Sequence, residues 1–302
     1  MVLVPTSTYG YLLPDIIVAL AGALLIVADL IWPAYDEATG RSRIWPAYLA
    51  IVGLLGAAVA ELPLVGVTKT LFSGIIEIDP LSAFFKLLFI AIGVIVILIS
   101  VEAVPRFTRW TAEFYALLMW TILGSMLLAS AAELFTIFLS LQLTSLPLIV
   151  LVGYAKRDPK SGEAALKYLL LVLVSTAVLL YGMSLIYGAL GTSTLGEIGA
   201  LLAKQRHIEP VVALGLVLLL TGFGFKITAA PFHYWVPDAY EGAPTPVTAF
   251  LSVGSKFAGF ALALRVIVAA ERVPLNWHVI FGVLAAISMT IGNLGAIRQI
   301  NI

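Results

Sequence analysis

The stretch VVALGLVLLLTGFGFKITAAPFHYW, residues 211–235, decides the fold class of this chain. It opens with a long apolar run, then carries Lys226 and, five residues later, Pro231. About 20 apolar residues in succession are enough for a helix to cross a bilayer. Lipid offers no partners for backbone amides and carbonyls, so the segment must be helical, and Pro231 removes one of the amides that a helix needs. We therefore predict a transmembrane helix that is broken near Pro231.

The same pattern recurs along the whole chain. Of its 302 residues, 61% are hydrophobic and 11% are charged, whereas a soluble domain carries about 25% charged residues. The sequence predicts an all-α, polytopic transmembrane helical bundle with short loops and no soluble domain. Nine stretches have the character of spans: Tyr11–Ile31, Pro46–Val65, Leu81–Val101, Ala112–Ser130, Leu134–Tyr154, Ala164–Tyr187, Val211–Ala230, Val247–Ala270 and His278–Ile297.

Composition also excludes several classes of site. The chain has no cysteine, which rules out disulfides, thiolate zinc sites and iron–sulfur ligation in this chain. The three histidines, His207, His233 and His278, are too far apart in sequence to suggest a metal site. The net charge of zero gives no reason to expect nucleic acid as a partner. We predict the lipid bilayer as the environment, with no metal, no nucleic acid and no soluble substrate.

The distribution of basic residues predicts the topology. The odd-numbered loops hold seven of them and the even-numbered loops hold four. Basic loops stay in the cytoplasm, so we expect the N-terminus to lie outside. The odd-numbered loops contain Arg41, Arg43, Arg106, Arg109, Lys156, Arg157 and Lys160. The even-numbered loops contain Lys69, Lys204, Arg206 and Arg272.

Two lysines fall near the middle of predicted spans. A lysine at a helix centre costs about 2.5–3.5 kcal/mol, so Lys226 and Lys256 are candidates for a proton relay. Desolvation brings the neutral and charged forms of such a lysine closer in free energy. Pro231 strengthens this interpretation, because a broken helix at membrane depth is tolerated where it lines a polar cavity. The alternatives are a lysine paired with a carboxylate for packing alone, and an ordinary proline kink.

Weaker candidates surround these lysines. His233 is either a proton relay beside the break or an interfacial histidine. Lys167 either sits at a site of proton uptake or extends to the interface, paired with Glu163 four residues earlier. Asp15, Asp29 and Glu133 lie near the ends of spans, and we expect all three at the interface.

Longer motifs carry a family resemblance. The segment GFGFKITAAPFHYWVPDAYEGAPTPV, residues 222–247, resembles the broken seventh helix and following loop of the antiporter-like subunits of respiratory complex I. FLSVGSK at residues 250–256, SLPL at 145–148 and EAALKY at 163–168 are similar to the subunit N type. Residues 130–302 carry these motifs, and the first hundred residues match in hydropathy alone.

The resemblance implies an organisation. It suggests a three-helix unit over residues 1–110, an antiporter-like five-helix repeat over 111–270, and the start of a second repeat over 271–302. The segment Arg298–Ile302 has no polar tail, and we expect a chain cut within a longer protein.

One position departs from the family pattern. The family places a glutamate in the fifth helix to partner the seventh-helix lysine, and this chain has Gln142 there. Glu133, nine residues earlier, falls on the opposite helix face about 13.5 Å away. Gln142 and Glu133 are therefore possible modulators of Lys226, although Glu133 cannot replace the missing glutamate.

The implied function is proton translocation as a subunit of NADH-quinone oxidoreductase, in a bacterial plasma membrane. The enzyme activity would belong to the assembly with other membrane subunits of complex I, and no redox chemistry would occur in this chain. NADH, FMN, iron–sulfur clusters and quinone would all bind elsewhere in that assembly. The alternatives are a subunit of an Mrp-type cation/proton antiporter, a membrane subunit of a hydrogenase or formate hydrogenlyase, and a non-conducting structural remnant.

Overall fold

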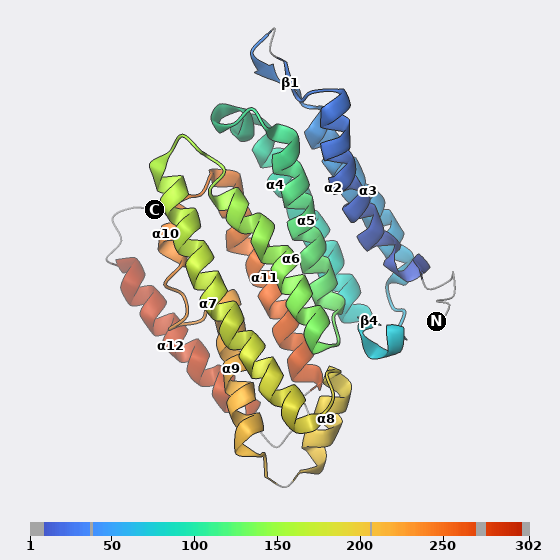
Figure 1. The fold of residues 1–302 in the computed structure, drawn as a ribbon, viewed down its shortest axis with the longest axis vertical. Helices are drawn as coiled ribbons and strands as arrows, with labels where there is room; N and C mark the ends of the chain where they lie inside the picture. The colour runs from blue at the N-terminus through green and yellow to red at the C-terminus, as the bar shows by residue number, and fades with distance from the viewer. Residues whose placement is uncertain (1–8, 37–38, 206, 270–275, 298–302) are drawn as a thin grey trace.

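The computed structural model describes residues 9–36, 39–205, 207–269 and 276–297, and the side chains of Ala269 and His278 are not described. These residues form a helical bundle (Figure 1). The helices are α2 (Leu13–Ile31), α3 (Trp45–Glu61), α4 (Pro80–Phe107), α5 (Thr111–Ser130), α6 (Leu134–Val152), α7 (Pro159–Leu190), α8 (Leu195–Lys204), α9 (Pro210–Lys226), α10 (Val236–Gly242), α11 (Thr245–Ala269) and α12 (Trp277–Ile297). Short 3-10 turns lie at Gly10–Leu12, Leu62–Leu64 and Phe72–Gly74.

Eight of the described helices are long and apolar enough to cross a membrane, and α9 is a shorter apolar helix. Together they occupy the nine predicted stretches, which confirms the all-α transmembrane class. The amphipathic helix α8 was not predicted, because its ten residues are too short for a span. Two small antiparallel hairpins, β1 (Tyr35–Asp36) with β2 (Arg41–Ser42) and β3 (Lys69–Leu71) with β4 (Ile76–Ile78), close the first loops.

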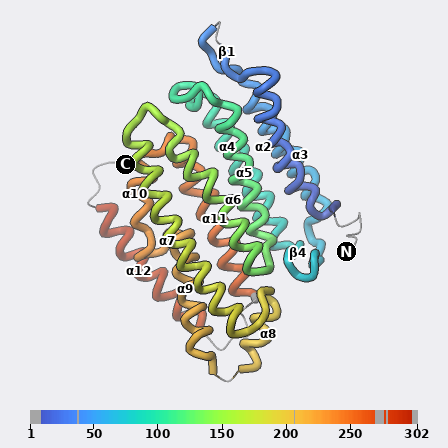
Figure 2. The backbone as a smooth tube through the Cα atoms, in the orientation of Figure 1, coloured from blue at the N-terminus to red at the C-terminus, as the bar shows by residue number. Residues whose placement is uncertain are grey.

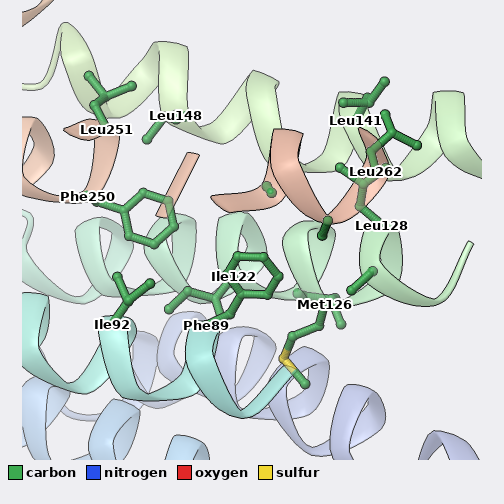
Figure 3. Close-up of a cluster of buried hydrophobic side chains, with 14 of the residues drawn as sticks. Phe89, Ile92, Ile122, Met126, Leu128, Leu141, Leu148, Phe250, Leu251 and Leu262 are labelled. Atoms are coloured by element: carbon green, nitrogen blue, oxygen red, sulfur yellow. The ribbon is translucent and has the colours of Figure 1, made fainter. Parts of the chain in front are cut away.

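Helix α5 is the centre of the bundle. It packs against α2, α4, α6 and α11, and most of its residues are buried. Helices α2 and α3 lie at one edge and α12 at the other, as the tube also shows (Figure 2). Side chains of α4, α5, α6 and α11 meet in the core, among them Phe89, Ile122, Leu148 and Phe250 (Figure 3).

Close helix contacts depend on small residues. A Cβ added to Gly124 of α5 would lie 2.4 Å from the backbone nitrogen of Thr144 in α6. Small residues of this kind let transmembrane helices approach closely without a hydrophobic driving force. This contact fixes α6, and with it Gln142 and Ser145, against the central helix.

A buried arginine ties the far end of α11 to the β3–β4 hairpin. The Arg265 guanidinium donates to Glu77 of β4 and to Asp79, the N-cap of α4, at 2.8 Å each. Its Nε donates to the carbonyl of Ala129 at 2.9 Å, and only 4% of its side chain is exposed. The sequence analysis did not predict that Arg265 would connect these elements.

Candidate functional site

The predicted break in the seventh span is present. Helix α9 ends at Lys226, and Thr228 has a left-handed φ of 59°. The amide of Ala229 still donates to the carbonyl of Gly224 at 2.8 Å, and the indole of Trp235 donates to the carbonyl of Phe225 at 3.2 Å. Polar groups outside the helix ladder therefore satisfy the broken segment, as a non-helical backbone at membrane depth requires.

Lys226 is buried directly before this break. Its side-chain ammonium donates to the Ser145 hydroxyl of α6 at 2.9 Å, and 7% of the residue is exposed. Among the residues that the structure describes, no carboxylate lies within ion-pair distance of Lys226. A cavity of about 30 Å³ adjoins both side chains, which is room for a water molecule. The site is thus a lysine held by a neutral hydroxyl beside a small space that is large enough for a water molecule.

Gln142 lies one helical turn from Ser145 but contacts a different partner. Its amide oxygen accepts a long hydrogen bond of 3.4 Å from the Thr176 hydroxyl of α7. Thr176 lines the same cavity as Lys226. Gln142 therefore borders the lysine site through Thr176 and supplies no anion to it.

Lys256 lies in the middle of α11 and is half-buried. Its ammonium lies 5.5 Å from the ring centre of Tyr240, in α10. An aromatic face attracts a cation, so this contact stabilises the charge without an anion. Within the described part of the chain, Lys256 forms no ion pair, a property that it shares with Lys226.

His233 lies in the break between α9 and α10. Its ring stacks on Tyr234 with centroids 5.0 Å apart, and its Nδ1 is buried without a hydrogen-bond partner among the described residues. No described contact joins it to Lys226 or Lys256. The relay role therefore stays a prediction, and it would require a bridging water.

Lys167 forms the predicted pair with Glu163 at 2.8 Å and a second ion pair with Asp238 of α10 at 3.3 Å. Its side chain is 45% exposed. Lys160 adds a further link from α7 to α10, bonding Glu241 at 2.8 Å. These pairs hold the segment after the break against the start of α7.

Glu133 is the N-cap of α6. Burial alone would raise the pKa of its carboxyl, but hydrogen bonds from Thr136 and Ser193 outweigh it and hold the pKa below its usual range. The amide of Thr136 donates to it at 2.8 Å. Glu133 therefore caps α6, and its expected interfacial position stays a prediction.

Sequence reasoning expected Asp15 near the end of its span, where it lies, but did not predict its burial and missed two of its neighbours. Asp15 is 4% exposed, and its carboxylate accepts from the ammonium of Lys86 in α4 at 2.5 Å. Glu61, the last residue of α3, is 1% exposed. A lysine five residues inside the third apolar stretch was the available signal for this cluster.

The transmembrane family described as NADH:quinone oxidoreductase/Mrp antiporter matches residues 131–302. NADH-quinone oxidoreductase subunit N of Trichlorobacter lovleyi is 40% identical over 98% of this chain and 60% of its own length. NAD(P)H-quinone oxidoreductase subunit 2 of Trichodesmium erythraeum is 43% identical over 95% and 55%. The similarity therefore extends into the first hundred residues, beyond the hydropathy match that was expected there.

Solved structures agree on the fold. A chain of respiratory complex I from Thermus thermophilus superposes with a TM-score of 0.77 at 32% identity, covering 95% of this chain and 58% of that one. A chain of the Mrp complex from Dietzia superposes with a TM-score of 0.78 at 21% identity, covering 97% and 55%, which shows a shared fold alone. The chain spans about 60% of the length of the first relatives that it matches.

Proposed function

This chain belongs to the NADH:quinone oxidoreductase/Mrp antiporter transmembrane family, and on that premise we propose that it is part of a proton-translocating, antiporter-like subunit of the N type in an NADH-quinone oxidoreductase. Its role is to move protons through a lysine relay while electrons pass from NADH to quinone in other subunits. Cofactors and quinone belong to those subunits. Residues 111–270 form the five-helix repeat that carries the relay, with the N-terminus outside.

The buried state of Lys226 carries this proposal. Its ammonium is bonded to a hydroxyl, with no anion among the described residues to neutralise it. Ionisable groups inside a membrane protein are costly, and they mark ion and proton pathways. A lysine without a fixed counter-charge releases its proton more readily than one in an ion pair. Lys226 is therefore suited to load and unload a proton at the broken helix.

We assign the remaining steps of the relay to Lys167, Lys256 and His233. Lys167 takes protons up at the start of α7, and Lys256 receives them in α11. His233 and water link these groups, with charge changes at one lysine altering the proton affinity of the next through their electrostatic interaction. Mobile water in a polar cavity bridges groups that do not touch directly.

Relatives favour NADH-quinone oxidoreductase over a free-standing antiporter. Identity is 40% to an N-type subunit across nearly the whole chain, against 21% to the chain of an Mrp complex with the same fold. Fold alone supports both functions, since one architecture serves many activities. The level of sequence identity therefore favours the N-type function.

The proposal predicts NADH-driven acidification of inside-out membrane vesicles from a strain that carries the intact gene. Deleting the gene should abolish the part of this acidification that depends on the complex, and re-expression should restore it. Proton release driven by a sodium or potassium gradient, equally strong without NADH, would contradict the proposal and support an antiporter.

Gln142→Glu should change the pH dependence of pumping. A carboxylate one turn from Ser145 would favour the charged form of Lys226, so half-maximal pumping on the alkaline side should move upward by roughly one pH unit. The control is Gln205→Glu at the end of α8, which should leave the profile unchanged. An unchanged profile for Gln142→Glu would place this side chain outside the reach of Lys226.

A further inference from the structure

A second group of buried ionisable side chains lies outside the proposed relay, in the N-terminal three helices. It joins Asp15 of α2, Glu61 of α3 and Lys86 of α4. Exposure is 4%, 1% and 0%, respectively. Glu61 interacts electrostatically with both of the others. One ammonium thus lies within electrostatic range of two carboxyl groups, and all three residues are shielded from solvent.

The hydrogen bonding of this group is incomplete. Lys86 donates to Oδ2 of Asp15 at 2.5 Å, which forms a neutral ion pair. Oδ1 of Asp15 and Oε2 of Glu61 are buried and have no hydrogen-bond partner among the described residues. A buried oxygen without a donor is destabilising, and it is more so when it carries charge. A proton on one carboxyl would supply the missing donor.

Charge balance leads to the same conclusion. With both carboxyls ionised, the group would carry one uncompensated negative charge away from water, which is strongly unfavourable. With one proton bound, the ammonium and one carboxylate balance, and the second carboxyl is neutral. We infer that Asp15, Glu61 and Lys86 form a site for one exchangeable proton, held mainly on Glu61 and separate from the Lys226–Lys256 relay.

The position of the site permits exchange with one face of the membrane. Asp15 lies in the first turn of α2, Glu61 ends α3, and Lys86 is the seventh residue of α4. At 1.5 Å per residue, Lys86 is only about 9 Å along its helix from the start of α4. A proton therefore needs to cross only the outer part of the bundle to reach Glu61.

Neighbouring charges are already engaged or lie elsewhere. At this end of the bundle Lys69 lies over the ring of Tyr11, 5.2 Å from its centre. Arg265 of α11, which packs against α4, is paired with its own two carboxylates. Helix α5 contacts α2, α3 and α4, and its acidic residue Glu113 is in its first turn, at the opposite end. Among the described residues, Asp15 and Lys86 are therefore the charges that govern Glu61.

Infrared spectroscopy of the purified complex in lipid nanodiscs tests the site directly. The C=O stretch of a protonated carboxylic acid should be present at neutral pH, should shift in D2O, and should disappear in Glu61→Gln. The matched control is Glu102→Gln in α4, whose side chain is 88% exposed, and this change should remove no acid band. Persistence of every acid band in Glu61→Gln, or a band that does not shift in D2O, would overturn the inference.

Two further variants separate proton binding from packing. Asp15→Asn should abolish the acid band although Glu61 is intact, because Lys86 would then need Glu61 as its carboxylate. Lys86→Met should add a second acid band, because neither carboxyl would keep a counter-charge. Unchanged bands in both variants would contradict the proton site and would mean that the group is a structural ion pair. Lys226→Met should leave all these bands intact. The infrared bands therefore test the Asp15–Glu61–Lys86 site, whereas proton pumping tests the lysine relay, and either proposal can be refuted without the other.

Discussion

Replacing Lys226 with methionine in the intact complex should lower NADH-driven proton translocation roughly tenfold or more. Methionine keeps much of the volume of the buried side chain and removes the group that binds the proton. The Ser145 hydroxyl would lose its donor but remain beside the cavity of about 30 Å³, where water can satisfy it. The fold should therefore persist while the relay is interrupted at the helix break.

Lys226→Arg separates proton transfer from charge. Arginine keeps a positive charge at this position but does not release its proton in proteins, so pumping should be lost here as well. The control Lys204→Gln changes an exposed lysine of α8 and should pump normally. Pumping would be measured by dye quenching in vesicles, with NADH oxidation followed in parallel. Near-normal pumping in Lys226→Met, in a fully assembled complex, would refute the assigned role.

Local patterns predicted most of the fold. The fourth span was expected over Ala112–Ser130 and is Thr111–Ser130. The sixth was expected over Ala164–Tyr187, but α7 begins at Pro159, where the Asp158 side chain accepts from the amide of Lys160. Hydropathy cannot detect this extension, because the first turn of α7 is polar and lies beyond the apolar run.

The candidate site was predictable only in part. The break at Pro231 and the burial of Lys226 follow from neighbouring residues, and both are present. The partner of Lys226, Ser145, is separated from it by 81 positions. Asp15 and Lys86 are separated by 71 positions. Hydropathy predicts how deep a residue lies in the membrane, but it does not predict which helix faces contact each other. These pairs could therefore be identified only from the three-dimensional packing of the helices.

Arg265→Met should be the most destabilising single change outside the proposed relay. The guanidinium is 4% exposed and holds Glu77 and Asp79, whose side chains are 38% and 21% exposed. Removing one partner of a buried ion pair costs about 3–5 kcal/mol, because the charge left behind is uncompensated. Partial exposure lets water solvate the two carboxylates, so we expect a loss of stability of about 3 kcal/mol, at the lower end of that range.

The comparison that isolates burial is Arg43→Met. Arg43 is 47% exposed and lies 3.7 Å from Asp36, and an exposed pair of this kind contributes about 0–1 kcal/mol. Thermal unfolding followed by tryptophan fluorescence should therefore shift by several degrees for Arg265→Met and little for Arg43→Met. Adding Glu77→Gln to Arg265→Met should recover part of the loss, since one stranded carboxylate is then neutral. Equal transition temperatures for the two arginine variants would mean that α11 is anchored by apolar packing, with the guanidinium adding little.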